Sequence, residues 1–138
     1  MIRLTRRYAF PAAHVLSHPS LTPEENWRVY GKCANPGGHG HNYGVEVTVA
    51  GPVEEGTGQV MSRERLDTLV QDRVLRRFGH RLLNDDELFG ERVPTAENLA
   101  ETIYERLEAP IAAEGRARLL RVRVLETRRN VFSYGGTR

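Results

Sequence analysis

The alternation of apolar and polar residues predicts four β-strands. Over residues 2–16 the even positions are mostly apolar, with Arg6 as an exception and His14 among them, and Arg3, Thr5 and Arg7 lie on the other parity. The same period-two pattern runs through residues 43–49 and 120–126, and residues 130–134 form a fourth candidate strand. Such alternation is typical of strands that bury one face and expose the other.

Two further segments have the spacing of amphipathic helices. Residues 63–78 and 95–113 place apolar side chains three and four positions apart, which gathers them on one helical face. Thr95 has the side chain of an N-cap, and Glu97 suits the positive end of the second helix. Residues 21–40 are rich in Pro, Gly, Asn and Glu and are predicted to be a long loop, which in a small domain usually serves function.

The order strand, loop, strand, helix, helix, strand, strand predicts an α+β fold. We expect a four-stranded antiparallel sheet with two helices packed on one face. The other face of so small a sheet would be left open, which is a reason to oligomerise. The chain has 138 residues with no repeat or linker, so we expect one domain over residues 1–138.

Composition narrows the class of protein. Hydrophobic residues make up 39% and charged residues 28%, which is typical of a soluble globular protein. No apolar run approaches the roughly 20 residues of a membrane helix, and no apolar segment follows the first arginines as a secretory signal requires. We therefore expect a cytoplasmic protein with no membrane partner. A net charge of +2, with arginines interleaved among acids, does not indicate nucleic-acid binding.

The densest chemical signal is the segment 31–43. His39 and His41 are two positions apart at the start of the second strand, so both point toward its buried face. His14 shares the inward parity of the first strand and approaches them if the two strands pair. A single histidine is more often an ordinary loop residue, but a His-x-His with a third inward histidine favours a metal. Three neutral imidazoles and an open fourth position are the pattern of a catalytic zinc site.

Two other residues are candidates for chemistry. Cys33, the single cysteine, cannot form an internal disulfide. It is either a small buried apolar residue or a thiol whose pKa is lowered by Lys32 and by a metal. Glu126 continues the inward parity of the third strand. It is either a strand end or a carboxylate that accepts two parallel hydrogen bonds from a ligand.

Several short segments carry a resemblance to a known family. They are residues 10–14 (FPAAH), 25–26 (EN), 31–33 (GKC), 35–43 (NPGGHGHNY), 58–61 (GQVM), 80–84 (HRLLN), 94–98 (PTAEN) and 126–127 (ET). No single segment is specific. Together, over nearly the whole chain, they resemble the 6-pyruvoyltetrahydropterin synthase family.

The resemblance implies a tunnelling fold, an assembly and a reaction. Trimers close a continuous β-barrel, and two trimers stack into a homohexamer with sites at subunit interfaces. The implied reaction is zinc-dependent elimination of triphosphate from 7,8-dihydroneopterin triphosphate, with internal redox rearrangement of the side chain to give 6-pyruvoyltetrahydropterin. An open sheet face is what such an assembly would cover.

The resemblance also implies roles for individual residues. The implied zinc ligands are His14, His39 and His41. Cys33 would be the catalytic thiolate, and His80, from a neighbouring subunit, the proton-relay histidine. The implied pterin contacts are Glu126 as the anchoring carboxylate, with Thr95 and Glu97 near the pocket. Candidate cations for the triphosphate are Lys32, Arg128 and Arg129.

Two features bear on the branch of the family. Five residues separate Cys33 from His39, whereas the related 6-carboxytetrahydropterin synthases of the queuosine pathway usually have three. Those relatives also usually carry an acidic residue where this chain has Ser62-Arg63. Both differences favour the pyruvoyl branch, with the carboxy branch as the alternative.

One position departs from the family pattern. The family usually has Asp directly before the relay histidine, where an acid would orient the imidazole, and this chain has Gly79. Asp85, Asp86 or Glu87 could take over that role from nearby. A non-catalytic pterin-binding relative is therefore a third reading of the sequence.

Overall fold

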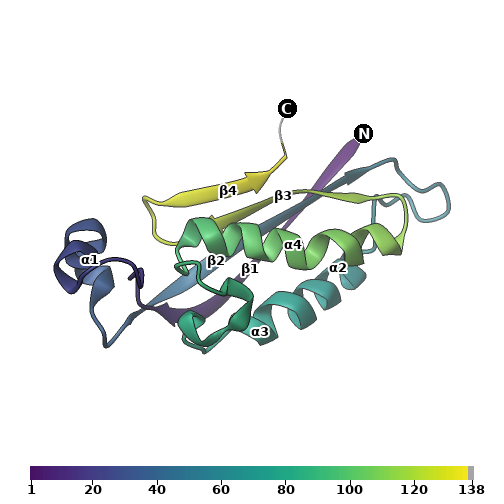
Figure 1. The fold of residues 1–138 in the computed structure, drawn as a ribbon. Helices are drawn as coiled ribbons and strands as arrows, with labels where there is room; N and C mark the ends of the chain where they lie inside the picture. Colours follow the sequence, from purple (N-terminus) through teal and green to yellow (C-terminus); the bar gives the residue numbers. More distant parts are fainter. Residues whose placement is uncertain (137–138) are drawn as a thin grey trace.

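The computed structural model describes residues 1–136 and contains one antiparallel sheet with strand order β1-β2-β3-β4 (Figure 1). The strands are β1 (Ile2–His14), β2 (His39–Gly51), β3 (Arg118–Leu125) and β4 (Val131–Gly135). The helices α2 (Arg63–Val70) and α4 (Ala96–Glu114) lie along the same face of the sheet. The predicted α+β architecture, with four antiparallel strands and helices on one face, is confirmed.

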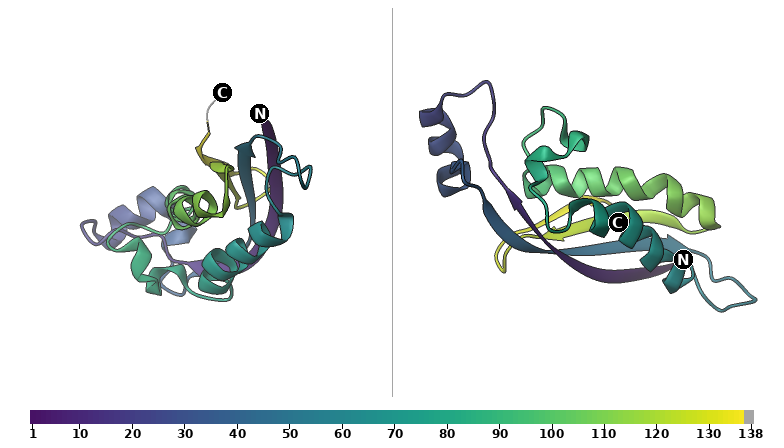
Figure 2. Two further views of the ribbon diagram at one scale, coloured as in Figure 1. Left: turned by 90° about the vertical axis from the view of Figure 1, so that its right-hand side faces the viewer. Right: turned by 90° about the horizontal axis from the view of Figure 1, so that it is seen from below.

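The long pair β1 and β2 dominates the sheet. Their register runs without a break from Ile2 opposite Gly51 to His14 opposite His39. Figure 2 shows both strands as long, strongly bent ribbons that extend well past β4. Because β1 ends where β2 begins, the last residues of one strand lie beside the first residues of the other.

The prediction of a loop over residues 21–40 is wrong in part. Residues Pro23–Tyr30 form helix α1, and Gly31–Ala34 form a 3-10 turn, η1. The Thr22 side chain accepts a hydrogen bond from the Glu25 backbone, and the Glu25 side chain accepts one from the Thr22 backbone. This capping box, with Pro23 in the first turn, starts a helix in a segment whose composition is otherwise typical of a loop.

The two predicted helices are present with nearly the predicted bounds. The first runs from Arg63 to Phe78 as α2, a π-helical turn η2 (Gln71–Leu75) and α3 (Arg76–Phe78). The second is α4, and Thr95 is its N-cap, because its side chain accepts from Asn98 N at 3.2 Å. Short 3-10 turns, η3 (Leu83–Asp85) and η4 (Glu87–Phe89), connect them.

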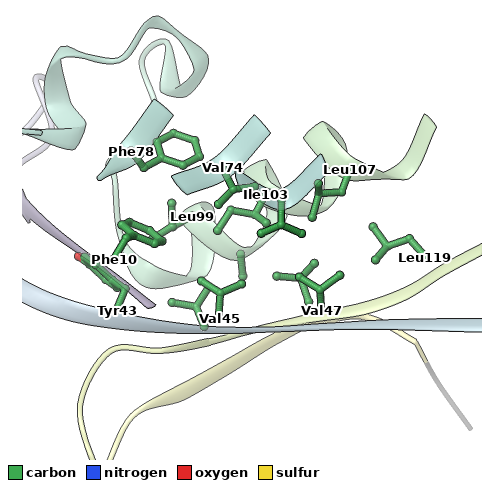
Figure 3. Close-up of a cluster of buried hydrophobic side chains, with 14 of the residues drawn as sticks. Phe10, Tyr43, Val45, Val47, Val74, Phe78, Leu99, Ile103, Leu107 and Leu119 are labelled. Atoms are coloured by element: carbon green, nitrogen blue, oxygen red, sulfur yellow. The ribbon is translucent and has the colours of Figure 1, made fainter. Parts of the chain in front are cut away.

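The core lies between the sheet and these helices (Figure 3). Strand residues of the inward parity meet the apolar faces of α2, α3 and α4, and the labelled set is Phe10, Tyr43, Val45, Val47, Val74, Phe78, Leu99, Ile103, Leu107 and Leu119. Arg6, the exception in the pattern of β1, also has the inward parity. Its guanidinium forms paired hydrogen bonds of 3.1 and 2.7 Å with Asp67 of α2, so an ion pair takes the place of an apolar contact.

The inward parity predicted for the third strand is wrong at its first residue. Leu119, 6% exposed, faces the core, whereas Leu120 is only half-buried. The register of β2 and β3 shifts between Thr48 and Val49, since Thr48 pairs with Arg121 and Val49 with Leu119. The extra residue of this bulge reverses the side-chain direction, which a period-two pattern cannot reveal.

The opposite face of the sheet carries charges instead of helices. Glu46 accepts from Arg7 at 3.0 Å and from Arg123 at 2.9 Å, and the hydroxyls of Thr5 and Thr48 are 2.8 Å apart. The prediction that helices pack on one face of the sheet is confirmed, whereas the other face is only partly open in the chain, because Glu46 is 6% and Thr48 2% exposed. Over the residues described, no helix has the length and apolar character needed to cross a membrane.

Candidate metal centre and active site

Three histidines converge where β1 ends and β2 begins. One ring nitrogen from each of His14, His39 and His41 lies within 4.8 Å of the other two. The Nε2 atoms of His14 and His39 are 3.0 Å apart, and His14 is fully buried. The three residues that the sequence put forward as metal ligands are thus brought together by the fold.

The local backbone explains how they meet. His39 and His41 share one face of β2, and the antiparallel register places His14 directly opposite His39. Gly38 leads into β2 with φ of +74°, and a Cβ there would lie 3.4 Å from the Val15 side chain and 3.5 Å from the His14 carbonyl oxygen. A glycine therefore lets the chain enter β2 close beside the end of β1.

The donor set fits a metal ion. His41 Nε2 is buried and has no hydrogen-bond partner among the described residues, so it is available to a ligand. Burial is the main cause that lowers the pKa of His14, to about 4, and it also lowers the pKa of His39, so both favour the neutral form that ligates metals. Tetrahedral Zn–N bonds place ligand nitrogens roughly 3.3 Å apart, close to the separation of the two Nε2 atoms. A divalent cation with nitrogen ligands, such as Zn²⁺, suits this cluster.

The outer nitrogen of His14 is also engaged. His14 Nδ1 lies 2.8 Å from the Pro94 carbonyl oxygen and 3.1 Å from the Tyr43 hydroxyl. Tyr43 is 0% exposed, and burial raises the pKa of its hydroxyl, with the Glu126 and Cys33 charges adding to the rise. The sequence marked Tyr43 only as an inward strand residue. A tyrosine two positions after a His-x-His on one strand face was the available signal for a site residue.

Glu126 and Cys33 lie at the same end of the sheet. Glu126 directly follows β3, its side chain is 14% exposed, and its Oε2 is 4.0 Å from His41 Nε2. Cys33 lies in η1 and is partly buried. Burial, and then the charge of Glu126, raises the pKa of Cys33. Of the two readings of Cys33, a pKa lowered by Lys32 does not hold in the chain alone, because the shift there is upward and burial and Glu126 are its causes.

His80 does not belong to the histidine cluster. It has a positive φ of 59°, and its backbone N–H donates to the Pro11 carbonyl at 2.6 Å, at the edge of β1 where Ala13 also pairs with Leu82. Its exposed side chain lines a cavity of about 520 Å³ together with His41 and Asn42. Within one chain His80 therefore lies near the end of the sheet but apart from the converging ring nitrogens.

The structure gives a reason for glycine at position 79, directly before His80. A Cβ added to Gly79 would lie 2.6 Å from the Leu75 carbonyl oxygen, so the backbone leaves no room for an aspartate. Asp86 cannot replace it, because its two oxygens bind Arg77 at 2.8 and 2.9 Å and one of them also accepts from Leu88 N. Asp85 and Glu87 are exposed.

For the remaining predicted residues the structure gives the element and the exposure. Thr95 is half-buried and follows Pro94, whereas Glu97 is exposed in the first turn of α4. Arg128 and Arg129 are exposed in the turn after Glu126. Among the predicted pterin contacts, Glu126 is the one with a short distance to the histidine cluster, 4.0 Å from its Oε2 to His41 Nε2.

Comparison with known proteins adds the family. The family model described as 6-pyruvoyl tetrahydropterin synthase matches residues 3–137. The chain belongs to this family. It is 40% identical over 134 residues to the 6-pyruvoyl tetrahydrobiopterin synthase of Drosophila melanogaster, covering 96% of this chain and 79% of that protein. It is 37% identical over 137 residues to the protein of the same name from Homo sapiens, covering 97% and 91%.

The fold agrees with a solved structure of the family. The Caenorhabditis elegans 6-pyruvoyl tetrahydropterin synthase superimposes with a TM-score of 0.88 at 35% identity, covering 99% of this chain and 96% of that one. The resemblance inferred from short segments is therefore confirmed along nearly the whole chain.

Proposed function

We propose that the protein is a zinc-dependent lyase that converts 7,8-dihydroneopterin triphosphate to 6-pyruvoyltetrahydropterin with elimination of triphosphate. The observation that carries the proposal is the convergence of three histidine nitrogens at one end of the sheet, where Glu126 lies 4.0 Å from His41. Family membership, and the names of relatives matched along almost their full length, support the choice of substrate.

The three histidines are the proposed zinc ligands, and within residues 1–136 the group of side chains that could hold a metal contains these three alone. A fourth position left open to substrate distinguishes catalytic from structural zinc. Zinc, when bound, supplies a Lewis acid that polarises the side-chain oxygens of the substrate and acidifies the adjacent C–H. Because His14 and His39 favour the neutral form, these ligands are available near neutral pH.

Glu126 is the proposed pterin anchor. A pterin presents an amino group beside a ring N–H, and a carboxylate accepts both in parallel. The 14% exposure of its side chain leaves the carboxylate accessible to a ligand while restricting water. Thr95 and Glu97, at the start of α4, are proposed to line the pocket.

Cys33 is the proposed general base. As a thiolate it would abstract a side-chain proton and return it at the neighbouring carbon. In the chain alone burial and Glu126 disfavour the thiolate, so the proposal requires a cation at the histidines to offset them. His80 is proposed to exchange the proton with solvent, from a neighbouring subunit.

Assembly is part of the proposal. The exposed position of His80, and the placement of the described helices on one face of the sheet, fit a homohexamer built as a dimer of trimers that closes a barrel, with sites at subunit interfaces. The proposed compartment is the cytoplasm. Lys32, Arg128 and Arg129 are the proposed cations for the triphosphate.

The decisive experiment incubates zinc-loaded protein with 7,8-dihydroneopterin triphosphate and identifies the product by mass spectrometry. Triphosphate release with a pyruvoyl product is expected, and a carboxyl product would instead assign the protein to the 6-carboxytetrahydropterin branch. Cys33→Ala should remove turnover. Failure of wild-type protein to release triphosphate, with Cys33→Ala behaving identically, would refute lyase activity and leave a pterin-binding protein.

Two controls separate the metal from the interface. His39→Ala should lose zinc, whereas His18→Ala should retain it, because His18 Nδ1 instead accepts a 2.6 Å hydrogen bond from the Ser20 hydroxyl. If sites span subunits, co-expression of Cys33→Ala with His80→Ala should restore part of the activity that neither variant has alone. No restoration would place both residues in sites of single subunits.

A further inference from the structure

His14 differs from the other two histidines in having both ring nitrogens engaged. Its Nε2 faces His39 at 3.0 Å. Its Nδ1 has two oxygen neighbours, the Pro94 carbonyl at 2.8 Å and the Tyr43 hydroxyl at 3.1 Å. Both His14 and Tyr43 are 0% exposed, so water cannot replace either contact.

The chemistry of these neighbours decides where the imidazole proton lies. A carbonyl oxygen can only accept a hydrogen bond, so the short contact with Pro94 requires a proton on Nδ1 of His14. In the neutral imidazole Nε2 then carries a lone pair and no proton. The Tyr43 hydroxyl oxygen can accept from the same N–H.

We propose that Tyr43 is a positioning residue for the metal, and that its hydroxyl together with the Pro94 carbonyl holds His14 with Nδ1 protonated and Nε2 presented as a ligand. The inference depends on the proposed metal site at the three histidines. Groups that hold the outer nitrogen of a ligating histidine fix its tautomer and ring plane.

The group of Tyr43 that contacts His14 is its hydroxyl, whereas its ring packs in the apolar cluster. The ring stacks on Phe10 with centroids 5.5 Å apart, and Figure 3 shows the two rings side by side at the edge of the apolar cluster. A phenylalanine would fill the same space. A hydroxyl buried this completely is unfavourable unless it is hydrogen-bonded, and the contact found for it among the described residues is His14.

The second holder, the Pro94 carbonyl, is itself rigidly placed. The backbone on either side of it is tied down, because Val93 O accepts from Thr95 N and from the Asn98 side chain, each at 2.8 Å. Thr95 then caps α4. Through this turn the orientation of His14 is tied to the start of α4, where the proposed pterin pocket lies.

The test measures zinc affinity by competition with a chromophoric chelator, using wild type, Tyr43→Phe and a matched Tyr104→Phe control. Tyr104 is partly buried, and its hydroxyl donates to the Leu119 carbonyl at 3.4 Å, away from the histidines. We expect Tyr43→Phe to bind zinc about tenfold more weakly, at the lower end of the effects seen for such partners because Pro94 remains. Tyr104→Phe should match wild type.

A second measurement covers the case in which Tyr43→Phe does not fold. Long-range ¹H–¹⁵N correlation spectra of zinc-loaded wild type should show His14 protonated at Nδ1 and metal-bound at Nε2. The reverse tautomer would overturn the inference, as would equal zinc affinity in Tyr43→Phe and wild type. If wild type itself binds no zinc, the proposed function fails together with the inference. If zinc binds with the same affinity in wild type and Tyr43→Phe, the inference about Tyr43 fails and the proposed function stands.

Discussion

Acid should destabilise the metal-free protein through His14. This imidazole is 0% exposed. Burial is the largest cause that lowers its pKa from 6.5 to about 4; nearby His39 and His41 add to the lowering, and the contact with Pro94 partly opposes it. The unfolded chain has no such environment, so its His14 takes up a proton at a higher pH than the folded protein does.

The direction and the size of the change in unfolding free energy follow from this difference in pKa. Between pH 6.5 and about 4 the unfolded state binds the proton and the folded state does not, so stability falls as the pH falls through this window. Each pKa unit corresponds to about 1.4 kcal/mol. The full loss is therefore about 3 kcal/mol, of which roughly 2.5 kcal/mol appears between about pH 7 and pH 4.5. Well above pH 6.5 the contribution of His14 is constant.

Urea denaturation of metal-free protein at about pH 7 and pH 4.5 measures the loss. His14→Gln is the matched control, because it removes this titration and leaves every carboxylate in place. The loss of unfolding free energy between the two pH values should be smaller in His14→Gln by roughly 2.5 kcal/mol. Equal losses in the two proteins would refute the claim that the fold keeps His14 neutral.

Three further predictions concern separate parts of the site. Gly79→Ala should lower the unfolding free energy by about 1–3 kcal/mol in urea melts, because the added Cβ would lie 2.6 Å from the Leu75 carbonyl oxygen. Gly56→Ala is the control, because the space around its added Cβ is open. Equal effects of the two substitutions would contradict the crowding at Gly79. Thr22→Ala should cost about 1 kcal/mol and speed amide exchange in α1 through loss of the capping box, and unchanged exchange would argue against it. The pKa of Cys33, measured by alkylation of this single thiol, should fall in Glu126→Gln and on zinc loading, and an unchanged value would exclude the carboxylate as a cause of the rise.

The strands and helices were predictable because each has a repeating pattern with one buried face. β1 and β2 alternate, and the segments 63–78 and 95–113 have helical spacing, so their bounds agree with the structure within one or two residues, apart from the start of β2, which begins at His39, four residues before the alternating segment 43–49. Two errors have local causes. α1 depends on two reciprocal hydrogen bonds at Thr22 and Glu25, and the bulge opposite Thr48 reverses the direction of Leu119 and Leu120.

The candidate site was also predictable only where it depends on strand pattern. Parity places His39 and His41 on one face, and the pairing of β1 with β2 adds His14, so the ligand set follows from strand pattern and one assumption about pairing. The role of Pro94 could not be predicted, because a carbonyl 80 residues from His14 reaches it only once α4 is packed.

The sequence by itself determined the strand and helix pattern, the three histidines and the family, since these depend on residue type and spacing. Only the tertiary structure decided the environment of those residues. It buried His14 beside Tyr43 and lowered its pKa, raised the pKa of Cys33 through burial and Glu126, and left no room for a side chain at Gly79. Solvation and charge depend on every neighbour that packing brings near, and neighbours distant in the chain leave no local pattern.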